Sequence, residues 1–344
     1  MSIADIGSAL DSLRPCFGPL VVPQQWARVR SVGGRLAGSW SHMIVETRLA
    51  PDCDQADIMV ALSRQQSQRH GARAEITGWA EGLVQAWSEG RSSLARSPVL
   101  WLEYDLPDDR PREPLVSVCT QPDLLEAGWG QPPHSSLQRE IAAQALDQLV
   151  LGAALVGHGA TSADIELRSL GATSRDAPQR GLLDQLERIA AELPRGLGLS
   201  HVAPLWPRGE RALRLTAYIP QTTVLPWLRA IRWPGDRSTA ERLVELASPD
   251  WVIVGVQVEV GEAQTRPYIA LELPVGVGGR RYAAMCAWLG RAVSAGWCDA
   301  DKARAVTEWP LQGPEGSLRR DVYLKLAWEP RRARPVVKAY VGAS

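Results

Sequence analysis

The sequence predicts an α+β protein in which units of helices plus an antiparallel hairpin repeat and close into a β-barrel surrounded by helices. Three observations carry this prediction: strand-like runs alternate polar and apolar residues, short polar segments join the runs in pairs, and helical periodicity fills the stretches between pairs. Short connections favour antiparallel hairpins and argue against a parallel sheet of strand–helix–strand units. The repetition is architectural, because no strict sequence repeat accompanies it.

The strand candidates are bounded by Pro, Gly and Asp residues, which are typical of turns. In chain order the clearest pairs are 99–106 with 115–120, 197–205 with 212–220, 251–260 with 266–274, and 321–328 with 335–341. A fifth, weaker pair is 42–49 with 57–62. Helical periodicity is seen at 76–88, 137–156, 182–193, 238–246, 282–295 and 301–309. We expect a single domain over 1–344, with a helix-rich part at 1–95 that includes the weaker hairpin and with the barrel hairpins at 97–344.

Composition limits the function classes. The 344 residues carry no net charge and no basic run, so nothing indicates a nucleic acid partner. No apolar stretch is long enough to cross a bilayer, and residues 1–19 lack the basic lead of a signal peptide. The five cysteines are an odd number without a C-x-x-C motif, which favours reduced thiols and a cytoplasmic location. The five histidines are scattered, so the sequence predicts no metal site.

Each strand candidate divides into two surfaces, because successive side chains of a strand point to opposite faces. One face is apolar, and we expect the helices to cover it; in 212–220 it comprises Leu213, Leu215, Ala217 and Ile219. The opposite face of the strands is polar. Its tyrosines and its candidate anion-binding cations are Arg214, Tyr218, Arg266, Tyr268, Tyr323, Lys325, Lys338 and Tyr340.

Two interpretations of the polar face stay open. An antiparallel sheet normally leaves one face in water. Alternatively, a ring of about ten strands encloses a lumen wide enough for a ligand, and the polar face lines it. The face holds four of the six tyrosines and two of the three lysines of the chain, and this composition favours a lumen. Such a wall can bind an anion through charge-assisted hydrogen bonds and stabilise a carbocation with aromatic rings.

The polar-face residues resemble inward strand motifs of the aromatic prenyltransferases with the ABBA (prenyltransferase barrel) fold, over roughly residues 97–344. Residues 338–340 (Lys-Ala-Tyr) resemble the Lys-x-Tyr pattern of that family, and 214–218 resemble Arg-x-Lys-x-Tyr with Thr216 in place of the lysine. Residues 266–268 (Arg-Pro-Tyr) resemble a further inward pair. Residues 102–105 resemble the early strand whose glutamate, here Glu103, accepts a proton from the aromatic acceptor. The strand 115–120 lacks the arginine often found at this place in the family.

The resemblance implies transfer of a prenyl group from an isoprenoid diphosphate to an aromatic, peptide or other small acceptor, with no cofactor required by the sequence. It implies that the four cations bind the diphosphate and that the four tyrosines shield the allylic cation from water. Glu103 is then the general base, or else an ordinary hairpin residue near a polar edge. Magnesium is compatible with this chemistry, but the one candidate motif, Asp105-x-x-Asp108-Asp109, fits a hairpin turn better.

A second function class uses the same surface without chemistry. A non-catalytic protein could bind a peptide or small ligand on the polar sheet face. Closure of the strands and convergence of the cations on one site would favour the enzyme, whereas dispersed cations or a blocked lumen would favour the binding protein. The sequence leaves the oligomeric state open.

Overall fold

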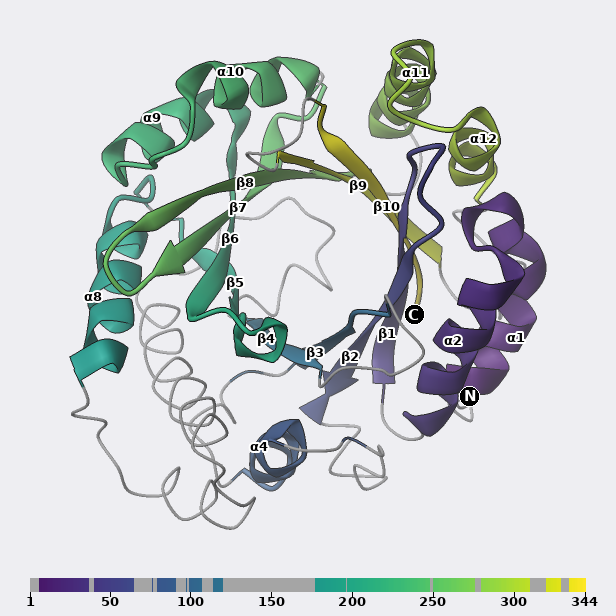
Figure 1. Ribbon diagram of the computed structural model, residues 1–344, viewed down its shortest axis with the longest axis horizontal. Coiled ribbons are helices and arrows are strands. Elements are labelled where there is room, and N and C mark those ends of the chain that lie inside the picture. Colours follow the sequence, from purple (N-terminus) through teal and green to yellow (C-terminus); the bar gives the residue numbers. More distant parts are fainter. Residues whose placement is uncertain are drawn as a thin grey trace.

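The computed structural model describes residues 6–36, 40–64, 76, 79–90, 97, 99–106, 114–119, 177–195, 197–247, 250–275, 280–309, 320–328 and 334–344. Its ten strands form one closed barrel in which every pairing is antiparallel. The order around the barrel is β1-β10-β9-β8-β7-β6-β5-β4-β3-β2, so every neighbouring pair except β1 and β10 is consecutive in the strand order (Figure 1).

The strands come as five consecutive hairpins. Their bounds are β1 Trp40–Arg48, β2 Ala56–Ser63, β3 Val99–Tyr104, β4 Leu115–Cys119, β5 Leu199–Pro204, β6 Ala212–Pro220, β7 Ile253–Gly261, β8 Thr265–Pro274, β9 Arg320–Trp328 and β10 Val336–Ala343. All five predicted strand pairs are therefore confirmed. The weaker pair, β1 and β2, closes the barrel against β10 and β3, so the barrel begins well before residue 97.

The helices form a ring outside the barrel (Figure 1). They are α1 Ile6–Phe17, α2 Pro23–Arg35, α4 Trp79–Ser88, α8 Ala177–Ala191, α9 Val224–Ala230, α10 Arg237–Leu246, α11 Arg280–Ser294 and α12 Ala300–Glu308, with short 3-10 turns η1 Gly18–Leu20, η3 Trp206–Arg208 and η4 Gln221–Thr223. The predicted helices at 76–88, 182–193, 238–246, 282–295 and 301–309 correspond to α4, α8, α10, α11 and α12. The predicted helix 137–156 lies outside the described residues.

The hydrophobic core lies between the barrel and this ring. The apolar strand face predicted for 212–220 is fully buried, and it shares one core cluster with apolar residues of the helices, such as Trp227 of α9 and Met285 of α11. Burial of this outer face is the main source of stability for such an architecture. Because side chains alternate along each strand, packing the apolar face outward turns the polar face inward. The prediction that the polar face lines a lumen is confirmed.

Candidate active site

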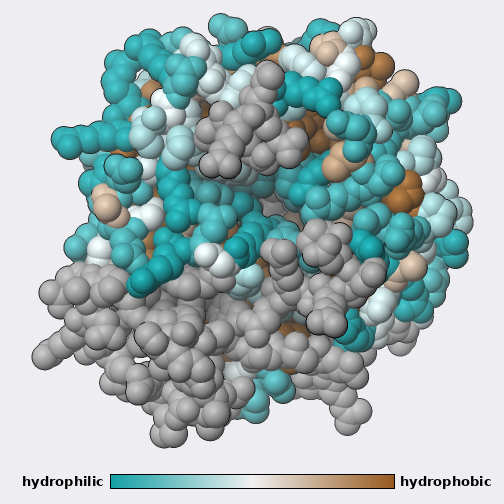
Figure 2. Space-filling view, in the orientation of Figure 1, coloured by the Kyte–Doolittle hydropathy of each residue, from teal (hydrophilic) through white to brown (hydrophobic). Residues whose placement is uncertain are grey.

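A row of polar side chains crosses the inner wall at one level. The strand register of β6, β7, β8, β9, β10 and β1 gives the order Tyr218, Gly255, Glu272, Lys325, Lys338 and Arg48, in which all but Gly255 carry a polar side chain. Cross-strand neighbours of this kind have Cβ atoms about 5 Å apart. Figure 2 shows hydrophilic side chains gathered around a central hollow on the face viewed in Figure 1. The sequence-predicted residues Tyr218, Lys325 and Lys338 thus belong to one internal surface.

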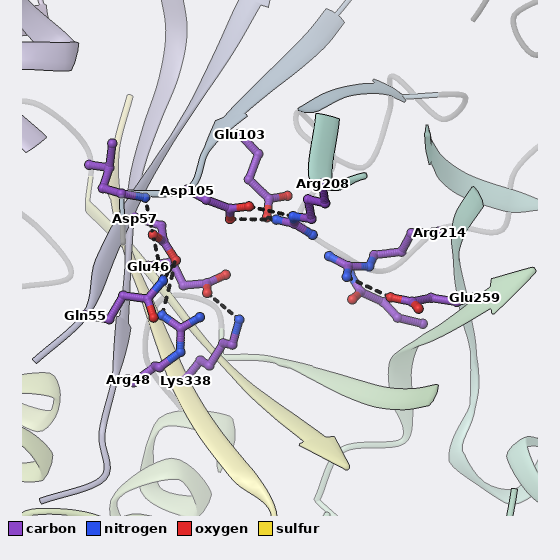
Figure 3. A network of polar contacts seen from close by, with 12 residues as sticks. Glu46, Arg48, Gln55, Asp57, Glu103, Asp105, Arg208, Arg214, Glu259 and Lys338 are labelled. Carbon is purple, nitrogen blue, oxygen red and sulfur yellow. Dashed lines mark hydrogen bonds and ion pairs between the residues drawn. The ribbon is translucent and has the colours of Figure 1, made fainter. Parts of the chain in front are cut away.

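Lys338 forms an ion pair with a carboxylate that sequence reasoning missed. Its Nζ lies 2.5 Å from Oε1 of Glu46 on β1 (Figure 3). Burial of Glu46 alone would raise its pKa, but Lys338, Lys325 and Arg48 outweigh burial and hold the pKa well below the ordinary value. Glu46 is therefore ionised at neutral pH and neutralises Lys338.

Glu46 faces a second carboxylate across the β1–β2 pair. Asp57 on β2 is its cross-strand partner, accepts a hydrogen bond from the Leu106 backbone N–H at 2.8 Å, and lies 3.2 Å from Arg48. Burial and the nearby negative charge of Glu46 raise the pKa of Asp57 to about 6. The β1–β2 side of the lumen thus carries two carboxylates, and the guanidinium of Arg48 forms its ion pair with one of them, Asp57.

The predicted general base, Glu103 on β3, is held by an arginine from a loop. Arg208 lies in η3, between β5 and β6, and binds Glu103 through Nη2; its Nε lies 2.6 Å from Oδ2 of Asp105 (Figure 3). Burial would raise the pKa of Glu103, but Arg208 and Arg214 lower it below the ordinary value. Glu103 is therefore ionised at neutral pH. Its second oxygen, Oε2, accepts no hydrogen bond from any described residue.

The two predicted arginines behave differently. Arg214 on β6 lies inside the barrel, 2.8 Å from Glu259 on β7 and 5.3 Å from the centre of the Tyr268 ring. Arg266 instead lies at the rim, where it pairs with Glu210 of the β5–β6 connection and its side chain is 33% exposed. Arg266 does not converge with the other cations, because it sits at the start of β8 near the hairpin end.

Lys325 differs from the other inner-wall cations. It is 3% exposed, and in the described part of the chain it makes no hydrogen bond and no ion pair. Its Nζ lies 5.8 Å from the centre of the Tyr340 ring, which stacks on Tyr323 with centroids 4.4 Å apart and an interplanar angle of 10°. Burial, then the positive charge of Arg214, lowers the pKa of Lys325.

An apolar patch adjoins these stacked rings inside the barrel. It is a small buried cluster separate from the outer core and comprises Ile44, Ala61, Val99, Trp101 and Tyr340, with Met59 and Tyr323 packed against it. The inner wall therefore offers an apolar, aromatic side next to charged groups, as expected for a site that binds a ligand with a hydrocarbon part and a polar part.

The strand β5 is irregular at Ser200 and His201. Strand neighbours normally point to opposite faces, but here the register shifts between Leu199 and His201, and His201 Nδ1 lies 3.1 Å from Ser200 Oγ. An irregularity of this kind inserts a residue and breaks the alternation. Burial lowers the pKa of His201 to about 4, and Ser200 Oγ donates to the Thr216 carbonyl, so the pair is structural.

The described residues contain neither a candidate metal site nor a candidate membrane-spanning helix. No group of three or more His, Cys, Asp or Glu side chains there could hold a metal ion. No helix among them is long and apolar enough to cross a bilayer. Of the Asp105-x-x-Asp108-Asp109 motif, only Asp105 is described, and it binds Arg208.

Comparison with solved structures identifies the architecture. A ternary complex of the prenyltransferase PriB with L-tryptophan and dimethylallyl thiolodiphosphate superposes with a TM-score of 0.52 at 16% identity, covering 99% of this chain and 96% of PriB. The chain has the prenyltransferase-barrel fold. The apo form of PriB gives a TM-score of 0.53 at 15% identity, covering 98% and 94% of the two chains. AnaPT from Neosartorya fischeri gives a TM-score of 0.49 at 11% identity, covering 96% and 90%. No family model and no curated protein matches the sequence.

The ABBA fold expected from the strand motifs is therefore confirmed, and it extends over nearly the whole chain rather than over 97–344 alone. Sequence reasoning missed the inner-wall partners Glu46, Asp57 and Arg208. Alternation along 42–49 could have placed Glu46 on the polar face. No sequence signal could have placed Arg208, which reaches Glu103 from a loop.

Proposed function

We propose that this protein transfers a prenyl group from an allylic diphosphate to an aromatic, peptide or other small acceptor inside its barrel. The bond between the prenyl C1 and the diphosphate oxygen breaks, and the diphosphate leaves with the electron pair. The acceptor carbon or heteroatom forms a new bond to the prenyl group, and a base takes the proton that the acceptor loses.

The observation that carries this proposal is Lys325, which is buried and has no hydrogen-bond or ion-pair partner among the described residues. A charged lysine held in a closed lumen without a carboxylate partner is costly to a protein unless a ligand compensates the charge. Lys325 lies between Lys338 and Glu272 on the inner wall and beside the Tyr323–Tyr340 stack. An allylic diphosphate would place its phosphates at the ammonium groups and its hydrocarbon chain against the rings. Lys338 and Arg214 would then contribute once the anion competes with Glu46 and Glu259.

The tyrosines would protect the cation that forms. An allylic cation is stabilised by the faces of aromatic rings and destroyed by water. Tyr323 and Tyr340 present a stacked wall, and burial raises the pKa of both phenols well above the ordinary value, so neither ionises near neutral pH. Tyr268 and Tyr218 extend this aromatic lining toward β8 and β6.

Glu103 would accept the proton. Its lowered pKa makes it a weak base, which suffices because an arenium or alkylated ammonium intermediate is a strong acid. Arg208 would orient the carboxylate while leaving Oε2 open to the acceptor.

A binding protein without catalysis is the second candidate, and one observation favours it. The inner-wall cations Arg48, Arg208, Arg214 and Lys338 each have a carboxylate partner already. A diphosphate must displace these partners, which weakens its binding compared with a site of free cations.

The experiment that tests the proposal uses thermal unfolding with dimethylallyl, geranyl and farnesyl diphosphate. Ligand binding to the folded state raises the melting temperature. We expect a rise with at least one diphosphate and a smaller rise in Lys338→Ala. No rise with any of the three, together with no change in Lys338→Ala, would contradict the proposal.

A second measurement separates the enzyme from the binding protein. Incubation with the stabilising diphosphate and tryptophan, tyrosine or a peptide containing them should yield a mass increase of one prenyl group on an acceptor. Glu103→Gln should keep the thermal shift and lower the transfer rate by roughly 10²-fold or more. A shift without any transfer would favour the binding protein.

A further inference from the structure

Glu272 on β8 is a buried carboxylate that forms no ion pair with any described residue, although it attracts the neighbouring Lys325 at longer range. It is 8% exposed, its Oε2 accepts from the Tyr218 hydroxyl at 2.7 Å, and its Oε1 accepts from the Gln257 amide at 2.5 Å. Both donors are neutral, and no described residue forms an ion pair with Glu272. The inner-wall carboxylates Glu46, Glu103 and Glu259, by contrast, each contact a lysine or arginine.

Gln257 supplies an unpaired acceptor beside this carboxylate. Its Oε1 is buried and has no hydrogen-bond partner in the part of the chain that the structure describes. A carboxylate only accepts, so the Gln257 amide must direct its NH₂ group to Glu272 and its oxygen elsewhere. A buried acceptor without a partner is unfavourable, and such an atom in a folded protein usually has a cause such as a functional role or a bound water or ion. Glu272 and Gln257 Oε1 together provide what the N–H groups of a cation require.

The wall at this place is kept open by a glycine. Gly255 lies next to Glu272 in the register, and a Cβ built there would lie 2.8 Å from Tyr218 Cε1 and 3.0 Å from Glu272 Oε2. Any larger residue would push the Tyr218–Glu272 pair aside. The glycine therefore permits the arrangement that fixes the carboxylate.

Glu272 lies beside the one described inner-wall cation that has no partner. Glu272 and Lys325 are cross-strand neighbours, yet no ion pair joins them. A diphosphate on Lys325 would bring more negative charge to a wall that already carries Glu46, Glu103, Glu259 and Glu272. A positive charge next to the diphosphate would offset this repulsion.

We propose that Glu272 and Gln257 form a subsite for a positively charged group of the acceptor, an ammonium or a guanidinium. The inference rests on the proposed function, because it places this cation beside the diphosphate on Lys325. The subsite predicts that the acceptor is positively charged, a property that the fold alone does not specify. Glu272 would bind the cation by charge, and Gln257 Oε1 would accept one of its N–H groups.

The test compares three probes of similar shape by titration calorimetry with the full-length protein: tryptamine, indole and indole-3-propionate. Each is titrated with and without dimethylallyl thiolodiphosphate. We expect tryptamine to bind at least about tenfold more tightly than indole-3-propionate, because a charge-assisted hydrogen bond in a buried site has about this effect on affinity. The preference should increase when the diphosphate analogue is present.

Glu272→Gln keeps the shape of the side chain and should reduce the preference to about threefold or less. The same variant should bind the analogue at least as tightly as the wild type, since it removes a negative charge beside Lys325. Gln257→Met should weaken tryptamine binding without affecting indole. The control is Glu262→Gln, a glutamate in the β7–β8 turn that pairs with Arg211 on the surface and should bind all probes as the wild type does.

Equal affinity for tryptamine and indole-3-propionate, no binding of tryptamine, or an undiminished preference in Glu272→Gln would each overturn the inference. Failure of the analogue to bind the wild type would instead contradict the proposed function. The amine preference measured without the analogue still decides the inference in that case.

Discussion

Two buried lysines of this chain have opposite environments. Lys302 of α12 is 5% exposed and lies outside the barrel, where its Nζ donates to the carbonyls of Arg48, Ala50 and Cys53 at 3.4, 3.3 and 2.5 Å. Lys325 of β9 is 3% exposed and lies inside the barrel without any such partner among the described residues. Lysine is rare in this chain, whose only other lysine is Lys338.

A structural charge differs from a functional one in whether the protein itself supplies the partners of that charge. The hydrogen bonds of Lys302 connect α12 to the β1–β2 turn. The N-cap residue of α12, Asp299, contacts the same turn, because its backbone N–H donates to the Leu49 carbonyl at 2.7 Å. The charge of Lys302 is satisfied by the protein itself. Lys325 has an environment that disfavours its charge, as its lowered pKa indicates. Proteins accept such a loss of stability where a ligand completes the site.

The largest effect is expected for Lys302→Met. The substitution removes a donor from the carbonyls of Arg48, Ala50 and Cys53 and the ion-pair partner of Asp54, and each such loss costs about 1–3 kcal/mol. We expect the free energy of unfolding to fall by about 3 kcal/mol or more, measured by urea denaturation. Diphosphate binding by the remaining folded protein should be unchanged. Wild-type stability in Lys302→Met would contradict the structural role.

Lys338→Met should cause the second-largest loss of unfolding free energy, because it leaves a buried carboxylate without its ion-pair partner. Glu46 is 2% exposed and would lose its partner at 2.5 Å, at a cost of about 3 kcal/mol. The double variant Lys338→Met/Glu46→Gln should recover most of that loss, since no unpaired charge remains. Equal stabilities of the single and the double variant would show that the pair is not coupled.

Replacement of Lys325 by Met should change the free energy of unfolding less than the two substitutions above, and the change should depend on pH. Its folded pKa lies below the ordinary 10.5 because of burial and then Arg214, so the unfolded chain binds the proton more tightly. The resulting penalty is absent well above pH 10.5, grows as the pH falls from 10.5 toward the folded pKa, and is fully present below the folded pKa. Lys325→Met should therefore be more stable than the wild type at neutral pH. This excess should shrink as the pH is raised toward 10.5. Denaturation at several pH values measures it.

Arg266→Ala should have the smallest effect. Its partner Glu210 and the arginine itself are 46% and 33% exposed, and such rim pairs contribute less than about 1 kcal/mol. Diphosphate binding should also remain within about twofold of the wild type. A larger loss of binding would place Arg266 in the site, contrary to its position at the rim.

The outer wall of the barrel could be predicted from the sequence, and the inner wall only in part. Strict alternation in 212–220 fixes which residues face outward, because burial of Leu213 and Leu215 requires no knowledge of other strands. The same alternation correctly placed Lys325 and Tyr340 on the inner face. Their surroundings depend on register and closure, which pair Lys338 with Glu46 nearly the whole chain apart. The loop residue Arg208 and the irregularity at His201 follow no periodicity, so the sequence could not reveal them.

The most direct test of this account titrates dimethylallyl thiolodiphosphate into wild type, Lys325→Met and Lys302→Met by calorimetry, alongside their unfolding free energies. We predict that Lys325→Met is at least as stable as the wild type and binds the analogue at least about tenfold more weakly. Lys302→Met should be less stable and bind the analogue as the wild type does. A Lys325→Met variant that is destabilised and still binds the analogue with wild-type affinity would contradict the central claim that Lys325 serves the ligand rather than the fold.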